Sequence, residues 1–229
     1  MKKFSLHGKK PLPPATRSSW WDGYVERLER NWRKLIKPED TIVLAGDISW
    51  AMRLTDTRKD FAFLQSLPGQ KIIMKGNHDY WWNTVSKMKR MTDNAFEFIF
   101  NSALSVENIA LAGTRGWIPE TSKKITEEDK VIILREQGRL ERSLIEAEKF
   151  NCEKIFAILH YPPFDEQRRP TKMMEIMKSH GVTDCIYGHI HGKQNFNNLP
   201  KELEGIQLHL TSSDYLNFKP LLLTEWNES

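Results

Sequence analysis

Four short apolar runs in this chain each end in polar residues of the kind that bind ligands. Residues 41–45 lead into Gly46-Asp47, residues 71–75 into Gly76-Asn77-His78-Asp79, residues 154–159 into His160, and residues 184–187 into Gly188-His189-Ile190-His191. The stretches between these runs have helical periodicity, and strands that alternate with helices are typical of parallel sheets with right-handed crossovers. Parallel strands bring their carboxyl ends to one edge, where α/β sheets bind ligands. The sequence therefore predicts an α/β fold with its chemistry at the strand ends.

The expected elements follow from periodicity and from turn residues. Ser18 or Ser19 could cap a first helix, and residues 8–19 form a Pro-rich arm before it. Further helices are expected near residues 56–67, 81–91, 127–150 and 171–180. Short strands at 97–100, 104–106 and 109–112 predict antiparallel pairing, and two last strands are expected near 206–211 and 221–225. The buried stripe of the first helix is predicted to be Trp21, Val25, Leu28, Trp32 and Leu35, and the inner face of the long helix to be Ile132, Ile133, Leu140, Leu144 and Ala147.

The length allows one large globular domain or two small ones, and the lack of an internal repeat or a convincing linker indicates one domain over residues 1–229. The chain has 39% hydrophobic and 28% charged residues, with a net charge of +4 spread among mixed charges. This mild basicity does not predict nucleic-acid binding. Cys152 and Cys185 are far apart and predict reduced thiols. No apolar run is long enough for a membrane span and no signal peptide is evident, so a cytoplasmic location is expected.

The donor set at the strand ends predicts a metal site. Asp47 offers a carboxylate, Asn77 an amide oxygen, and His160, His189 and His191 offer imidazoles. Donors of this kind, without a thiolate, suit Mn, Fe, Zn, Co or Ni. One polar strand end is unremarkable, but four are hard to explain by packing, because buried polar groups need partners.

The same motifs, in the same order, resemble those of the calcineurin-like metallophosphoesterases. The resemblance covers about residues 41–192 and implies a four-layer αββα sandwich of two mixed sheets. It implies hydrolysis of a phosphomonoester or phosphodiester by water activated between two divalent metal ions, with manganese as one choice. Asp47 would bridge the two ions, Asn77, His160 and His189 would complete one site, and His191 would belong to the other. His78 would contact the phosphate or protonate the leaving group, and Asp79 would orient His78.

One motif of the family is absent from this sequence. The family begins with a strand that ends in Asp-x-His, whereas this chain begins Met-Lys-Lys-Phe-Ser-Leu-His7 and has its first Asp at Asp22. The first strand is therefore expected to be missing or incomplete. Three interpretations compete: a misplaced start or a deletion removed the strand, the protein works with a single metal site, or His7 replaces the missing ligands.

Two main functions remain open at this point. The first is a metal-dependent phosphoesterase acting on a small phosphorylated substrate. The second is a degenerate, non-catalytic protein that binds metal or phosphate. A nuclease of the same family is a third idea, with only scattered basic residues behind it. Arg115, between two glycines at a strand end, is interpreted as a solvated turn residue, and Trp50, Trp81 and Trp82 as packing residues in the core or at its rim.

Overall fold

The computed structural model describes residues 22–224, and these residues form two β-sheets. The smaller sheet has three parallel strands in the order β1-β2-β3. The larger sheet has six strands in the order β4-β5-β6-β7-β9-β8, in which β5, β6, β7 and β9 are parallel and β4 and β8 are antiparallel to their neighbours. The strands are β1 (Thr41–Leu44), β2 (Gln70–Met74), β3 (Phe96–Ile99), β4 (Ala103–Val106), β5 (Ile109–Thr114), β6 (Lys154–Leu159), β7 (Asp184–Tyr187), β8 (Glu202–Leu203) and β9 (Ile206–Leu210).

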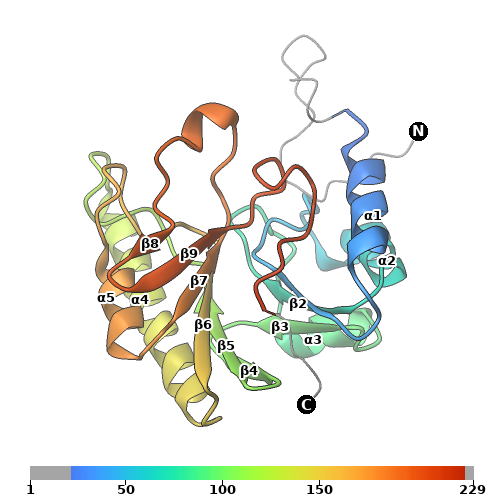
Figure 1. Cartoon of the computed structure of the whole chain (residues 1–229), viewed down its shortest axis with the longest axis horizontal. Helices are drawn as coiled ribbons and strands as arrows, with labels where there is room; N and C mark the ends of the chain where they lie inside the picture. Colours follow the sequence, from blue (N-terminus) through green and yellow to red (C-terminus); the bar gives the residue numbers. More distant parts are fainter. Residues whose placement is uncertain (1–21, 225–229) are drawn as a thin grey trace.

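Five α-helices within residues 22–224 cover the outer faces of the sheets (Figure 1). They are α1 (Tyr24–Leu35), α2 (Arg58–Ser66), α3 (Val85–Met91), α4 (Glu127–Glu148) and α5 (Lys172–Ser179). The long helix α4 begins in a capping box, in which the Thr126 side chain accepts from Asp129 N–H and the Asp129 carboxylate accepts from Thr126 N–H. Within the described residues, none of these helices is long and apolar enough to cross a membrane.

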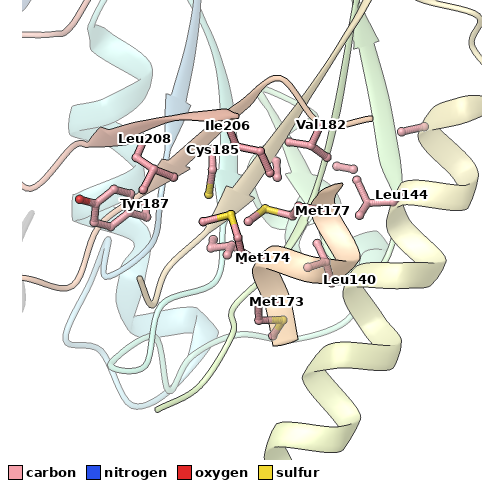
Figure 2. Close-up of a cluster of buried hydrophobic side chains, with 14 of the residues drawn as sticks. Leu140, Leu144, Met173, Met174, Met177, Val182, Cys185, Tyr187, Ile206 and Leu208 are labelled. Carbon is pink, nitrogen blue, oxygen red and sulfur yellow. The ribbon is translucent and has the colours of Figure 1, made fainter. Parts of the chain in front are cut away.

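Three apolar clusters separate four layers, and they confirm the predicted αββα sandwich. The first lies between helices α1, α2 and α3 and the small sheet, and includes Trp32 and Trp81. The second lies between the two sheets, where Met74 of β2 and Ile158 of β6 are both buried. The third lies between the large sheet and helices α4 and α5, and Figure 2 shows its three buried methionines, Met173, Met174 and Met177. Burial of such side chains is the main stabilising contribution in a layered fold.

Several predicted elements need correction. Strand β3 pairs parallel with β2, so only β4 and β5 of the three short strands form the expected antiparallel pair. Residues 221–224 are not a strand, whereas the two-residue strand β8, paired with β9, was not predicted. On α1, Leu35 is 49% exposed because it is the last helical residue and lies beyond the packed stripe. On α4, Ile132 is only half-buried, and Glu136 and Ser143 lie on the inner face instead.

Other predictions agree with the structure or lie outside it. The strands around residues 154–159, 184–187 and 206–211 and the helices around 127–150 and 171–180 are present with nearly the predicted bounds. Cys152 and Cys185 are free thiols, and burial raises the pKa of Cys185. Some predictions concern residues outside the described range: those for the Pro-rich arm, for a first strand that is missing or incomplete, for His7 and for Trp21.

Candidate metal centre at the strand ends

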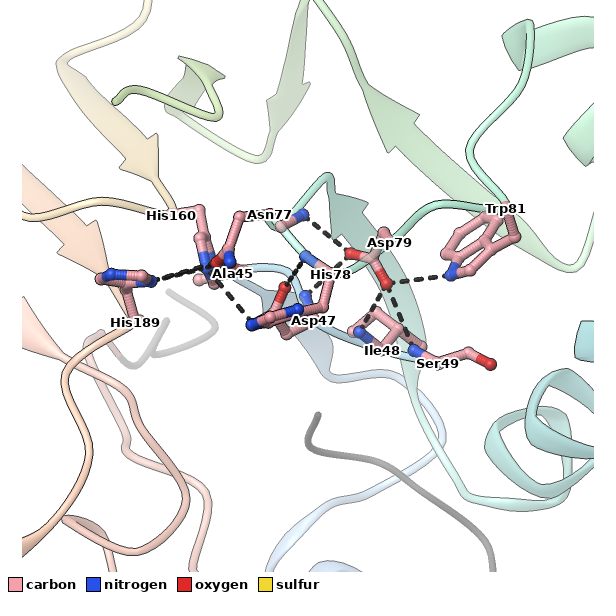
Figure 3. Close-up of polar contacts among 11 residues, drawn as sticks. Ala45, Asp47, Ile48, Ser49, Asn77, His78, Asp79, Trp81, His160 and His189 are labelled. Carbon is pink, nitrogen blue, oxygen red and sulfur yellow. Dashed lines mark hydrogen bonds and ion pairs between the residues drawn. The ribbon is translucent and has the colours of Figure 1, made fainter. Parts of the chain in front are cut away.

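Four of the predicted ligands meet at one point between the two sheets. Asp47 and Asn77 follow the neighbouring strands β1 and β2 of the small sheet, and His160 and His189 follow the neighbouring strands β6 and β7 of the large sheet. His160 Nε2 lies 2.7 Å from Asn77 Oδ1 and 3.5 Å from Asp47 Oδ2. His189 Nδ1 lies 3.1 Å from Asn77 Oδ1 and 3.3 Å from His160 Nε2 (Figure 3). We refer to these four side chains as the ligand cluster.

Glycines bring the two loops of the small sheet close enough for the cluster to form. A Cβ on Gly46 would lie 2.5 Å from Gly76 N, and a Cβ on Gly76 would lie 2.1 Å from Asp47 Oδ1. Real Cβ atoms do not approach so closely, so both positions require glycine. The backbone of Asp47 has a φ of 59° and that of His189 a φ of 69°. Both residues are therefore in the left-handed region, which turns the chain sharply at the ends of β1 and β7.

The hydrogen bonds of His160 direct a lone pair into the cluster. Its Nδ1 lies 2.8 Å from the carbonyl oxygen of Ala45, and a carbonyl can only accept, so Nδ1 carries the proton. In the neutral ring, Nε2 then presents a lone pair toward the oxygens of Asn77 and Asp47. A convergence of lone pairs on one point is stabilised by a bound cation.

His189 is held in the neutral form. Burial, followed by the neighbouring His160, lowers the pKa of His189 to about 4. The ring of Tyr161 packs on the His189 ring with 4.1 Å between centroids, and burial raises the pKa of this tyrosine to about 12. The His189 imidazole is therefore available as a ligand at neutral pH, because a metal ion binds only a deprotonated nitrogen.

The separations in the cluster fit a divalent ion. Bonds of about 2.1 Å to nitrogen and oxygen would place neighbouring donors about 3.0–3.4 Å apart, and the observed separations of 2.7–3.5 Å bracket this range. Across residues 22–224 no group made purely of three or more His, Cys, Asp or Glu side chains is arranged to hold an ion. The ligand cluster includes an amide oxygen beside its carboxylate and imidazoles, so it is not a group of that kind.

Asp79 has a different place from the one that the resemblance implied. Its carboxylate is fully buried and accepts five hydrogen bonds, at 2.7–3.2 Å, from the backbone N–H groups of Asp47, Ile48, Ser49 and Gly76 and from Trp81 Nε1. Burial, followed by the Asp47 carboxylate, raises the pKa of Asp79 to about 6, against the N–H donors that lower it. The expected bond from Asp79 to the His78 ring is not among its contacts in the described part of the chain. Asp79 therefore joins the β1 and β2 loops.

His78 lies beside the cluster with its ring packed by aromatic residues. Its backbone N–H donates to Asp47 Oδ1 at 2.8 Å, which leaves the other oxygen of Asp47 directed at the cluster. The Trp50 ring lies 4.3 Å from the His78 ring, and the Tyr80 ring lies 6.2 Å away. Among the described residues, His78 Nδ1 is buried and has no hydrogen-bond partner. Trp50 is thus a packing residue, as predicted, but it packs on His78, a candidate catalytic residue.

His191 is paired with a residue that was not predicted. Its Nδ1 lies 2.8 Å from Asp214 Oδ1. Although burial raises the pKa of Asp214, the hydrogen bonds from His191 and from Gly192 N–H outweigh it, and the net effect lowers this pKa. Asp214 follows β9 in a segment with little periodicity, and only its acidic side chain could have attracted attention.

Arg115 is not the solvated turn residue that was expected. Its side chain is 17% exposed, lies 3.7 Å from the fully buried Glu136 and packs over the Trp117 ring at 4.4 Å. Burial lowers the pKa of Arg115, and Glu136 opposes that effect. The Arg115 carbonyl accepts from the backbone N–H groups of His160 and Tyr161, both at 3.0 Å. Arg115 therefore holds the backbone at His160 and Tyr161 in place.

The fold and the ligand cluster together define an α/β protein with a candidate metal centre at the carboxyl ends of its strands. A family model described as calcineurin-like phosphoesterase matches residues 6–193. The chain belongs to this family, whose members are generally hydrolases that bind divalent metals.

The curated proteins contain no match to this chain. Two solved structures are similar: the protein of unknown function AQ665 from Aquifex aeolicus, at 19% identity, a TM-score of 0.47 and coverage of 91% of this chain and 84% of that one; and TT1561 of Thermus thermophilus, at 11% identity, a TM-score of 0.48 and coverage of 76% and 79%.

Proposed function

We propose that this protein is a metal-dependent phosphoesterase that hydrolyses a small phosphorylated substrate. The observation that supports this function is a connected set of close contacts. His160 Nε2 lies 2.7 Å from Asn77 Oδ1 and 3.5 Å from Asp47 Oδ2, and His189 Nδ1 lies 3.1 Å from Asn77 Oδ1 and 3.3 Å from His160 Nε2. Two oxygens and two imidazole nitrogens form a donor set suited to Mn, Fe, Zn, Co or Ni. His191 would bind a second ion.

Each residue of the site has a separate task in this proposal. The four members of the ligand cluster would hold an ion, and a bound ion would supply a coordinated water of lowered pKa and polarise the phosphate. His78 follows Asn77 directly and would donate a proton to the leaving oxygen. Its Nδ1 has no partner among the described residues, so that atom does not commit the ring to a structural bond. Asp79 acts by holding the loops that carry Asp47 and Asn77.

The test is hydrolysis of p-nitrophenyl phosphate and of its bis ester by metal-free protein, with each of the five metals added back. We expect turnover that depends on the metal and that is lost in His160→Asn. The matched control is His209→Asn, because His209 pairs with Asp184 on the large sheet outside the cluster. Absence of turnover with all five metals, or equal turnover by His160→Asn, would contradict the proposal.

The same experiment separates the main alternative. Metal bound at one ion per chain, with phosphate bound and neither ester hydrolysed, would support a non-catalytic member of the family. Preference for the mono- or the bis ester would assign a phosphatase or a phosphodiesterase, and cleavage of DNA would move the proposal to a nuclease. The cytoplasmic location stays a prediction.

A further inference from the structure

The segment that follows β9 crosses from the large sheet toward α1 (Figure 1). We define residues 211–218 as the strap. Thr211 fastens its start, since its backbone N–H and its hydroxyl donate to the Tyr187 carbonyl at 2.8 and 3.0 Å. Phe218 fastens its end: the side chain is 2% exposed, and its carbonyl accepts from Asn31 Nδ2 of α1 at 2.9 Å. The strap thus links the end of β7, which leads to His189 and His191, with the first helix.

We propose that Asp214, in the middle of the strap, is the positioning residue of His191. The contact of Phe218 with Asn31 of α1, which we call the anchor, keeps Asp214 in place. The proposal rests on the proposed function, in which His191 is a metal ligand. Asp214 Oδ1 faces His191 Nδ1 at 2.8 Å, and Asp214 Oδ2 accepts from the Gly192 N–H at 2.8 Å. The two oxygens therefore fix both the ring and the backbone next to it.

The contact also sets which ring nitrogen carries the proton. A carboxylate can only accept, so His191 Nδ1 is the donor, and Nε2 is left with a lone pair. Asp214 Oδ1 also accepts from the Tyr215 N–H at 3.1 Å, so this carboxylate is already engaged by three donors. It is therefore suited to orienting a ligand, as carboxylates behind metal-bound imidazoles do, more than to binding an ion itself.

Further contacts join the His191 loop to the strap and stiffen it. The Tyr215 ring of the strap meets the Phe196 ring at 5.1 Å in an edge-on arrangement. Asn195 Nδ2 donates to the His191 carbonyl at 2.6 Å. At the far end, Phe218 packs against Tyr24, with 6.0 Å between the ring centroids, and under Arg27, whose Cζ lies 4.6 Å from the ring. Loss of the anchor on α1 would therefore release the residues that hold His191.

The first experiment reads the tautomer of His191 directly, without metal or activity. Full-length, metal-free protein is labelled with ¹⁵N-histidine, and the His191 signals are assigned by their loss in His191→Gln. We expect the Nδ1–H tautomer in the wild type and a shift toward Nε2–H in Asp214→Ala. Asp184→Ala is the matched control, because it removes the carboxylate of another His–Asp pair, 2.7 Å from His209, and should change only the His209 signals.

The second experiment measures binding of Mn²⁺ and Zn²⁺ by calorimetry. Loss of a carboxylate behind a metal-bound imidazole should weaken the affinity by about 10–100-fold in Asp214→Ala. Asn31→Ala should also weaken the metal affinity, but by a smaller factor. Arg33→Ala should leave the affinity unchanged, because Arg33 bonds to Glu29 and Ser66 and not to the strap.

The outcomes distinguish this proposal from the proposed function. A wild-type His191 in the Nε2–H form, or an unchanged tautomer in Asp214→Ala, would overturn the role of Asp214. Wild-type affinity in Asn31→Ala would overturn the role of the anchor. If the wild type bound no metal while the tautomer shifted as expected, the metal-dependent function would fail and the positioning by Asp214 would stand.

Discussion

Replacement of Asp79 by Asn tests whether this residue holds the loops together or orients His78. Asn has the same shape, but one of its two groups is an NH₂ that can only donate. Oδ2 faces the N–H groups of Asp47 and Gly76 at 2.8 and 2.7 Å, and Oδ1 faces those of Ile48 and Ser49. Either orientation of the amide therefore sets an NH₂ group against two backbone donors in a site with no exposure to solvent.

The cost follows from those two donors. A buried donor left without an acceptor costs about 1–3 kcal/mol, so two of them predict a loss of about 2–6 kcal/mol in the free energy of unfolding. This is a large fraction of the total for a domain, which is about 5–15 kcal/mol. Urea unfolding of metal-free protein at pH 8 measures the loss under conditions where the wild-type carboxyl, with its pKa of about 6, is ionised.

Asp165→Asn is the matched control for this substitution. Asp165 is 2% exposed and also accepts backbone N–H groups, those of Gln167 and Arg169, but it lies on the loop between β6 and α5. We expect both variants to lose stability and only Asp79→Asn to lose metal affinity. If Asp79→Asn unfolded within about 1 kcal/mol of the wild type while hydrolysis was lost, the residue would serve His78, and the reasoning from its five donors would be refuted.

Three other perturbations test the geometry of the site. Gly76→Ala should abolish metal binding, because the new Cβ would lie 2.1 Å from Asp47 Oδ1. Its control, Gly138→Ala in the middle of α4, should stabilise the protein by about 0.5–1 kcal/mol. Thermal unfolding and metal titration compare the two variants. The folded-state pKa of His189 is depressed from 6.5 to about 4, so its contribution is present above pH 6.5 and is lost as the pH falls toward 4. The metal-free wild type should therefore lose about 3 kcal/mol more than His189→Gln over that interval, and equal losses in urea titrations would contradict this. Addition of Mn²⁺ at 100 times its dissociation constant should stabilise the wild type by about 2.7 kcal/mol and His160→Asn by far less, as read from unfolding curves with and without EDTA.

The sequence predicts the layers and the members of the ligand cluster, because both depend on the local pattern of apolar runs and the polar residues after them. Asp47, Asn77, His160 and His189 each follow an apolar run, and the convergence of parallel strand ends brings such residues together. The pairing of β3 was mispredicted because three short strands separated by turns have the pattern of a meander. The direction in which a strand pairs depends on which sheet it joins, and periodicity does not contain that information.

The residues that hold the ligands were harder to predict, because their partners lie far away in the chain. His160 donates to Ala45, 115 residues away, and His191 is 2.8 Å from Asp214, 23 residues away. Asp79 was visible as part of a motif, but its five donors come from two separate loops and from Trp81, so its task depends on the tertiary structure. The sequence pattern predicts a solvated turn residue at Arg115, because its counterion, Glu136, comes from the face of α4 that periodicity predicts to be apolar.

Glu136 shows how a charge inside the α4 interface can contribute to the site. It has no exposed surface in the described structure, and it accepts from Thr114 Oγ1 at 2.5 Å and from Arg139 Nη1 at 2.6 Å. A buried carboxylate is costly unless it is paired and hydrogen-bonded, and here Arg115 is a third partner at 3.7 Å. The same arginine has the carbonyl that holds the backbone of His160. An apolar replacement of Glu136 would leave Arg115 buried without its counterion. A shift of Arg115 would then displace the backbone of His160, and with it one member of the ligand cluster.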